Sequence, residues 1–119
     1  MKKTLVLGAS LKSNRYSNMA VQKLIDHNID TEAFGLKAGK IGRVQIKTNF
    51  NDFQNIHTVT LYVGLKHQPE YYKALLNLDP KRVIFNPGTE NPDFYKILKN
   101  NNIEIEVACT LVLLSTKQY

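Results

Sequence analysis

Small residues and positive charges are grouped near the start of the sequence in a pattern suited to binding an anion. Gly8, Ala9 and Ser10 follow a short apolar run, and small side chains there leave room for a ligand to approach the backbone. Lys12 and Arg15 come next and bring positive charge to the same stretch. Both residue types bind phosphate through charge-assisted hydrogen bonds. The pattern therefore predicts a phosphate-binding turn.

The segments on either side of this turn are expected to be a strand and a helix. Residues 4–7 form a continuous apolar run, typical of a parallel strand that is buried on both faces. Apolar residues then recur on one face of residues 20–25, with Ser17 or Asn18 as the predicted N-cap of the helix. The N-terminus of a helix presents unpaired N–H groups and a partial positive charge to an anion. The whole stretch is therefore interpreted as a phosphate-binding βα unit.

Strand and helix patterns alternate along the rest of the chain. The glycine-containing stretch 37–42 is expected to be a basic loop, and Phe50 and Phe53 are expected to anchor a polar loop to the core. Later helices are predicted from Gln68 or Pro69 to Leu78 and from Pro92 with Asn91 as its cap. Residues 111–115 fit a strand or a short helix, and Thr110 as a cap favours the helix. Further strands are predicted at 30–37, 43–46 (an edge strand), 57–63, 81–85 and 103–107.

This alternation predicts the fold class. We expect an α/β protein with a Rossmann-like, doubly wound and mostly parallel sheet of five to six strands, and helices on both faces. Residues 1–119 are expected to form a single domain. In the strand order 3-2-1-4-5-6 the first strand lies beside the 57–63 strand, and ligands bind off the carboxyl ends of these two. The small-residue turn would then face residues 63–65.

Composition narrows the classes of function. The hydrophobic content of 43% and the charged content of 22% are ordinary for a soluble globular protein, and no apolar run is long enough to span a bilayer. A single cysteine excludes an internal disulfide and fits a reducing cytoplasm, so a cytoplasmic location is expected. The net charge of +6 favours an anionic partner. Because the basic residues are scattered, nucleic acid is the less favoured anion.

The end of the second predicted strand indicates which nucleotide the turn could hold. A dinucleotide fold of the NAD type has the sequence GxGxxG and an acidic residue that binds the ribose hydroxyls. This chain has GASLKSNRYS instead and places Lys37 where the acid would be. A cation there pairs with an additional phosphate near the ribose, so NADP and coenzyme A both qualify.

Several stretches together resemble a known family. GAS followed by RYSN, then GLKAG, KRVIFNPGTENP and ACTLVLLST, look like the small stand-alone CoA-binding proteins, which are similar to the nucleotide-binding domain of the succinyl-CoA synthetase α subunit. The resemblance covers nearly the whole chain. It implies coenzyme A or an acyl-CoA as ligand, but not ligase activity, because the chain lacks the synthetase's second domain with its phosphorylated histidine.

The resemblance also implies which residues contact the ligand. The first loop would hold the CoA pyrophosphate, a basic residue after the second strand would lie near the adenosine phosphate, and two later loops would border the same site. Carried over by position, the implied CoA-binding residues are Gly8, Ala9, Ser10, Arg15, Tyr16, Ser17, Lys37, Val63, Gly64, Leu65, Asn86, Pro87 and Gly88.

Candidate catalytic residues do not form a recognisable set. Cys109 follows the last predicted strand, but a lone cysteine beside apolar residues is more often a small buried hydrophobe. The three histidines have no metal-ligand spacing to one another. No nucleophile, base and orienting group can be combined from the sequence. We therefore expect a CoA-binding module without catalysis of its own, which could present its ligand to a protein partner; the alternatives are an NADP-dependent enzyme and a nucleic-acid-binding protein.

Overall fold

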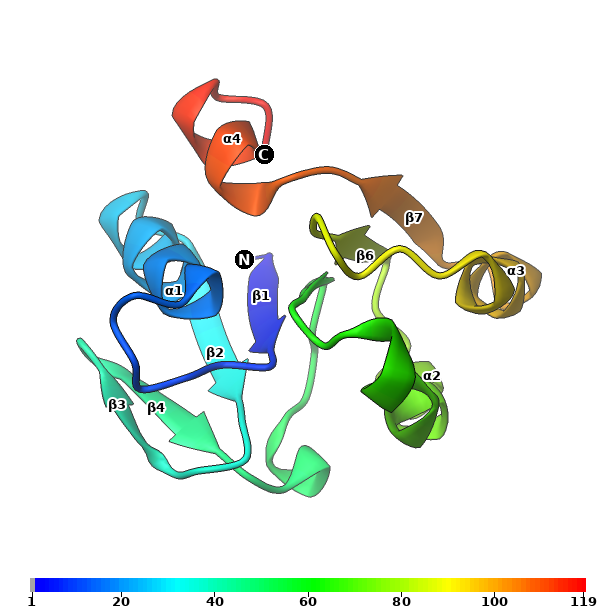
Figure 1. Cartoon of the computed structure of the whole chain (residues 1–119), viewed down its shortest axis with the longest axis horizontal. Helices are drawn as coiled ribbons and strands as arrows, with labels where there is room; N and C mark the ends of the chain where they lie inside the picture. Colours follow the sequence, from blue (N-terminus) through cyan, green and yellow to red (C-terminus); the bar gives the residue numbers. More distant parts are fainter. Residues whose placement is uncertain (1) are drawn as a thin grey trace.

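The computed structural model describes residues 2–119 as one seven-stranded sheet with helices on both faces (Figure 1). The strands are β1 (Lys3–Leu7), β2 (Asp30–Phe34), β3 (Gly39–Ile41), β4 (Val44–Lys47), β5 (Thr58–Leu61), β6 (Arg82–Phe85) and β7 (Glu104–Val107). The α-helices are α1 (Tyr16–Asp26), α2 (Tyr72–Leu78), α3 (Pro92–Asn100) and α4 (Thr110–Ser115), and two 3₁₀ helices are η1 (Phe50–Asp52) and η2 (Leu65–Tyr71).

The strand order is β3-β4-β2-β1-β5-β6-β7. All neighbouring strands are parallel except β3 and β4, which form an antiparallel hairpin at one edge. The fold class is as predicted, and the six predicted strands follow the expected order with β1 beside β5. The prediction of five to six strands was one short, because β3 lies in the stretch 37–42 that was expected to be a loop. Its hairpin turns at Gly42, which has a φ of +59°.

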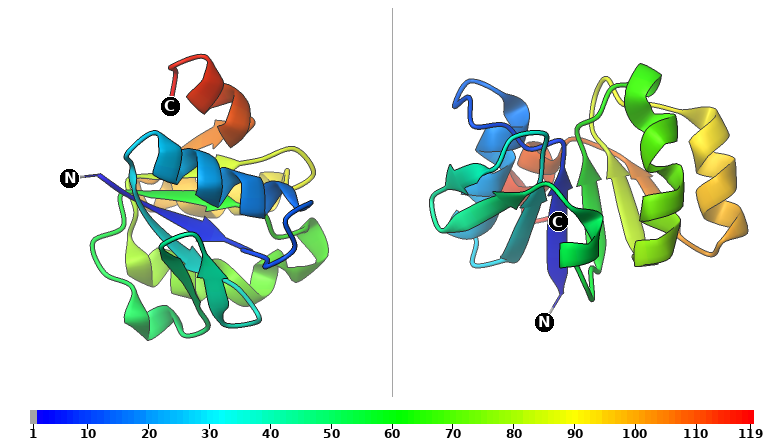
Figure 2. Two further views of the ribbon diagram at one scale, coloured as in Figure 1. Left: turned by 90° about the vertical axis from the view of Figure 1, so that its left-hand side faces the viewer. Right: turned by 90° about the horizontal axis from the view of Figure 1, so that it is seen from below.

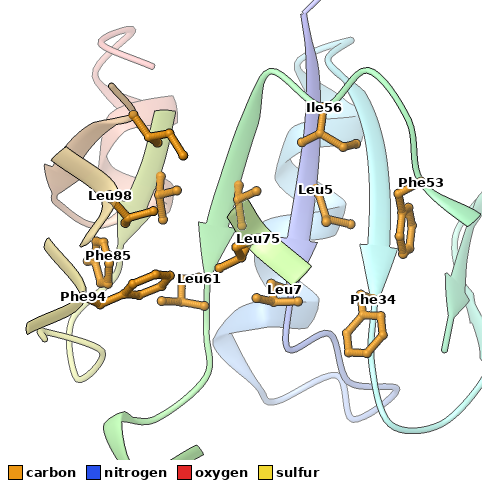
Figure 3. Packing of buried hydrophobic residues seen from close by; sticks show 13 residues of the cluster. Leu5, Leu7, Phe34, Phe53, Ile56, Leu61, Leu75, Phe85, Phe94 and Leu98 are labelled. Atoms are coloured by element: carbon orange, nitrogen blue, oxygen red, sulfur yellow. The ribbon is translucent and has the colours of Figure 1, made fainter. Parts of the chain in front are cut away.

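Two apolar layers hold the helices against the sheet. One layer packs α2 and α3 onto one face through Leu75, Phe94 and Leu98, and continues to Phe53 beyond η1 (Figure 3). The other packs α1 and α4 onto the opposite face through Val21, Leu24 and Leu114. Alternate residues of β1 serve each layer, because successive side chains of a strand point to opposite faces. Phe53 is buried and Phe50 packs against it, as expected of core anchors.

Element boundaries near the predicted site differ from the expected ones. Helix α1 begins at Tyr16 with Arg15 in the N-cap position, so neither Ser17 nor Asn18 is the cap. Strand β2 ends at Phe34 rather than at Lys37. The reason is Gly35, where an added Cβ would lie 2.5 Å from the carbonyl oxygen of Ala9, so the chain turns there around the β1–α1 loop.

Candidate functional site

The carboxyl ends of the parallel strands lie together, and this end of the sheet is called here the carboxyl edge. The loops after β1, β2, β5, β6 and β7 all lie at this edge (Figure 2). The first two of these loops adjoin directly. The amides of Gly8 and Ala9 both donate to the carbonyl oxygen of Phe34, at 3.0 and 2.8 Å, and Gly35 lies against Ala9. Leu11 also reaches across and packs over Gly39 of β3. This contact fixes the β1–α1 loop beside the loop that carries Lys37.

The turn after β1 needs its small residues for packing as well as for any ligand. Gly8 has a φ of +99°, and an added Cβ would lie 3.0 Å from the backbone of Tyr62 at the end of β5. Ala9 is 9% exposed. Because the amides of Gly8 and Ala9 are already bonded, backbone donors for an anion must come from Ser10 onward. Ser10 itself is half-buried, and its hydroxyl accepts a hydrogen bond from the Lys12 amide at 3.1 Å.

The N-terminus of α1 completes the small-residue turn. Helix geometry leaves the amides of its first residues, Tyr16 and Ser17, without an intrahelical acceptor. No side chain caps this end and no acidic residue lies in the first turn, so its positive partial charge is not neutralised locally. The Ser17 side chain is buried, whereas Arg15 and Tyr16 are exposed, Tyr16 at 70%. The geometry is suited to an anion held by backbone N–H groups and the Arg15 side chain.

Asn18 is a residue whose part in this turn was not predicted. It is 4% exposed and lies in the first turn of α1. Its side-chain nitrogen donates to the carbonyl oxygen of Ser10 at 2.9 Å, and its side-chain oxygen accepts a hydrogen bond from Gln22. Asn18 thereby ties the β1–α1 loop to the helix. The sequence signal was present, since Asn18 was considered as an N-cap, but its partner is the carbonyl of the preceding loop.

The predicted residues after β2 and β5 are mostly exposed. Lys37 lies in the turn between β2 and β3 with its side chain in solvent, and so does the neighbouring Leu36, at 86% exposed. Val63 is half-buried, and Gly64 and Leu65 are exposed where η2 begins. A Cβ added at Gly64 would meet nothing within 4 Å, so this glycine borders open space.

The predicted residues after β6 are of two kinds. Asn86 is 1% exposed, and its side chain donates to Thr60 Oγ1 at 2.7 Å and to the Leu61 carbonyl at 2.9 Å while it accepts from the Thr110 amide at 2.9 Å. It thus joins β5, β6 and the start of α4. Pro87 and Gly88 are exposed at the loop tip, and Gly88 has a φ of +92°. Of the predicted residues after β6, only Pro87 and Gly88 are exposed enough to contact a ligand.

A second buried side chain, Gln68, joins the neighbouring loops. It is 1% exposed and donates to the carbonyl oxygens of Val63 at 2.9 Å and Thr89 at 2.7 Å. Its own side-chain oxygen accepts a hydrogen bond from Asn91, which also donates to the hydroxyl of Tyr72 and caps α3. Sequence reasoning assigned Gln68 only to a helix start, because its partners are distant in sequence.

Tyr62 and Cys109 lie near each other on the α4 side of this edge. Burial, with the nearby Cys109 thiol, raises the pKa of Tyr62 to about 12. The Tyr62 hydroxyl is buried and has no hydrogen-bond partner among residues 2–119. Cys109 is a half-buried free thiol that makes no hydrogen bond to a histidine or carboxylate in this part of the chain. Among the described residues, Cys109 is thus paired with no base that would activate its thiol.

Two cavities, of about 540 and 530 Å³, lie away from this edge. One is between α1 and α4, and the other is at the opposite, N-terminal ends of the strands. The candidate site is formed by the loops that follow the strands. No helix among residues 2–119 is both long and apolar enough to cross a membrane.

Comparisons with known proteins show which family the sequence matches. A family model described as a CoA binding domain matches residues 2–115. A solved protein described only as uncharacterized is 42% identical, with a TM-score of 0.95, and the match covers 100% of this chain and 98% of that one. No curated protein matches the sequence.

More distant solved structures share the fold. A protein from Thermus thermophilus is 18% identical with a TM-score of 0.88, over 99% of this chain and 90% of that one. A hypothetical protein from Pyrococcus horikoshii OT3 is 23% identical with a TM-score of 0.87, over 98% and 83%. At these identities the similarity bears on the fold alone.

Proposed function

Because the chain belongs to the CoA binding domain family, we propose that it holds coenzyme A or an acyl-CoA on the loops at the carboxyl ends of β1, β2 and β5, and catalyses no reaction of its own. The observation that carries the site assignment is the adjoining pair of loops after β1 and β2. They bring an uncapped helix N-terminus, Arg15 and Lys37 to one edge, and no acidic side chain lies in the first turn of α1.

Each group has a part in this proposal. The amides of Ser10, Tyr16 and Ser17 donate to the pyrophosphate, and Arg15 pairs with it. Lys37, exposed on the adjoining loop, pairs with the phosphate on the ribose. Gly8 and Ala9 shape the turn. The neighbouring part of the site is lined by Val63, Gly64 and Leu65.

The loop after β6 supports the ligand from the other side in this proposal. Pro87 and Gly88 contact the ligand at the exposed loop tip. Asn86 acts as a positioning residue, because its side chain is committed to three internal hydrogen bonds. A rigid loop there lowers the conformational entropy that is lost when the ligand binds.

The test is calorimetric titration of the purified chain with CoA, acetyl-CoA, dephospho-CoA, NADP and NAD at moderate salt, with a random oligonucleotide as a control for charge. We expect saturable binding of CoA that weakens when the 3′-phosphate is absent. Equal binding of CoA and acetyl-CoA would show that the thiol end is free of the protein, whereas a preference would identify the acylation state. Binding of NADP in preference to CoA would favour the alternative, an NADP-dependent enzyme, and would overturn the proposal.

Two further features accompany the proposed function. A chain that binds CoA without reacting has to act through another molecule, so a protein partner that receives the ligand is part of the proposal. The single free cysteine fits a reducing compartment, so we place the protein in the cytoplasm. Nucleic acid is disfavoured as a partner, because the charges proposed to bind phosphate belong to two loops rather than to a continuous basic face.

A further inference from the structure

The cavity of about 530 Å³ lies at the N-terminal ends of the parallel strands. The loops proposed to bind CoA lie at the other end of the same strands. The cavity spans the starts of β1, β5, β6 and β7, and the right panel of Figure 2 shows the end of the sheet at which β1 starts. The residues that give it its character are Lys2, His57, Lys81, Arg82, Glu104 and Tyr119.

Side chains from distant parts of the chain build one wall of this cavity. The chain turns back after α4, where the amides of Gln118 and Tyr119 bond to the Leu113 carbonyl at 2.8 and 3.1 Å. The Tyr119 hydroxyl then hydrogen-bonds to the hydroxyl of Thr4 in β1. The Arg82 guanidinium lies over the Tyr119 ring, 4.8 Å from its centroid. The wall is therefore held in place by contacts within the chain.

Positive charge predominates among the lining residues. Arg82 is paired with Glu106 at 3.0 Å and also donates to Thr58 at 3.3 Å. Lys2 and Lys81 are exposed and take part in no ion pair within residues 2–119, whereas Glu104 supplies the one acidic side chain among the lining residues. The pKa of His57 is lowered by burial and by Lys2, Arg82 and Lys81, against the opposing effect of Glu104. Burial and the three neighbouring cations thus both favour the neutral form of this imidazole.

We propose that this cavity is a second anion site, which takes a small phosphate monoester that carries hydroxyl groups. Lys2 and Lys81 supply the two unpaired charges that a dianionic phosphate needs, and His57 adds a ring nitrogen as donor. The volume exceeds what a bare phosphate fills, so there is room for a ligand that has a body as well as a charged end. Glu104 accepts hydrogen bonds from hydroxyl groups of that body.

This site is independent of the proposed CoA site. The two lie at opposite ends of the same strands, so a substitution at one leaves the side chains of the other in place. CoA also carries phosphates, however, and free phosphate could bind at both edges. The test must therefore show where an anion binds, besides whether it binds.

The first experiment is titration of the ¹⁵N-labelled chain with inorganic phosphate and with glycerol 3-phosphate at constant ionic strength, followed by amide NMR shifts. We expect saturable shifts around Thr58, Arg82 and Tyr119, with glycerol 3-phosphate bound more tightly than phosphate. Lys81→Gln should weaken both about three- to tenfold. The matched control, Lys99→Gln on the exposed surface of α3, should not change them. Shifts confined to residues 10–17, or equal weakening by both variants, would overturn the proposal.

Two further measurements test the role of charge in this cavity. Glu104→Gln removes an acidic side chain from the lining and should tighten binding of inorganic phosphate a few-fold while it reduces the advantage of glycerol 3-phosphate. Sulfate, which stays dianionic near neutral pH, should raise the pKa of His57 measured from its ring protons, because a bound anion favours the imidazolium. His27 and His67, which lie outside the cavity, serve as internal controls. An unchanged pKa of His57 in saturating sulfate would overturn the assignment.

Discussion

Two groups of loops lie at the carboxyl ends of the strands, and they are held in different ways. One group follows β1 and β2, and the other follows β5, β6 and β7. The first group, residues 8–15 and 35–38, is called here the open loops. Its contacts with the rest of the fold are backbone bonds to Phe34, the packing of Gly35 and Leu11, and a side-chain hydrogen bond from Asn18. The second group, residues 62–71, 86–91 and 108–109, is called the tied loops. Buried Asn86 and Gln68 join it from within.

This difference matches two physical requirements of the proposed site. Groups that bind an anion must keep donors unsatisfied in the free protein, and exposed loops can do so because water serves those donors until the ligand arrives. A supporting wall has the opposite requirement, since a buried polar group that lacks a partner destabilises the fold. Substitutions of exposed residues in the open loops should therefore affect binding, and substitutions of buried residues in the tied loops should affect stability.

The largest expected effect is on stability, from Asn86→Ala. The change removes three buried hydrogen bonds and leaves the Leu61 carbonyl and the Thr110 amide without their side-chain partner. We expect the free energy of unfolding to fall by roughly 2–4 kcal/mol. Chemical denaturation measures it, with Asn77→Ala at an exposed position of α2 as the matched control. A loss as small as that of the control would end the distinction between the two groups of loops.

Arg15→Ala tests the open loops through binding. The Arg15 side chain is exposed and makes no ion pair within the described residues, so its removal should leave the stability unchanged within about 0.5 kcal/mol. Loss of a charge-assisted contact to the pyrophosphate should weaken binding by roughly 1.5–3 kcal/mol. The weakening should be the same for CoA and dephospho-CoA, because both contain the pyrophosphate. A loss seen with CoA alone would place Arg15 elsewhere.

Lys37→Ala distinguishes the second phosphate from the first. It should weaken CoA binding by roughly 1.5–3 kcal/mol yet hardly affect dephospho-CoA, so that the preference between the two ligands shrinks. Lys99→Ala, at an exposed lysine on α3, should affect neither ligand. Calorimetric titration of both ligands into both variants provides the measurement. An unchanged preference would remove Lys37 from the ribose phosphate.

Sequence patterns predicted most of the fold because the elements here are local in origin. A continuous apolar run marked β1, and β-branched and aromatic residues marked β5. Asn91 with Pro92 marked the start of α3, whose cap the structure confirms. Strand β3 was missed because Gly39 and Gly42 are typical of loops; its strand character depends on pairing with β4. The end of β2 at Gly35 depends on a contact with Ala9, which lies far away in the sequence.

The candidate site was harder to predict than the fold for the same reason. The sequence placed Gly8, Arg15 and Lys37 on loops at one edge, which needs only the order of strands. Whether a polar side chain faces a ligand or the interior depends on partners from other elements, as with Asn86, whose partners lie on β5 and α4. Composition alone does not separate an exposed asparagine from a buried one.

The smallest expected effect concerns Tyr62, the one side chain in the tied loops with an unpaired buried hydroxyl among the described residues. Tyr62→Phe removes that hydroxyl without breaking a hydrogen bond, so at pH 7 the stability should stay the same or rise by less than about 1 kcal/mol.

The pH dependence of this variant has a defined sign. An unfolded tyrosine loses its proton near its ordinary pKa of 10.0, whereas burial raises the pKa of Tyr62 to about 12, so wild-type stability should fall as the pH rises from about 10 towards 12. Tyr62→Phe lacks this contribution and should lose about 1 kcal/mol less than the wild type at pH 11. Denaturation at pH 8 and pH 11 compares the two, and the other ionisable groups cancel in the difference. An equal loss of stability in both proteins would mean that the Tyr62 hydroxyl is solvated. The tied loops would then exclude water less well than the buried side chains of Asn86 and Gln68 indicate.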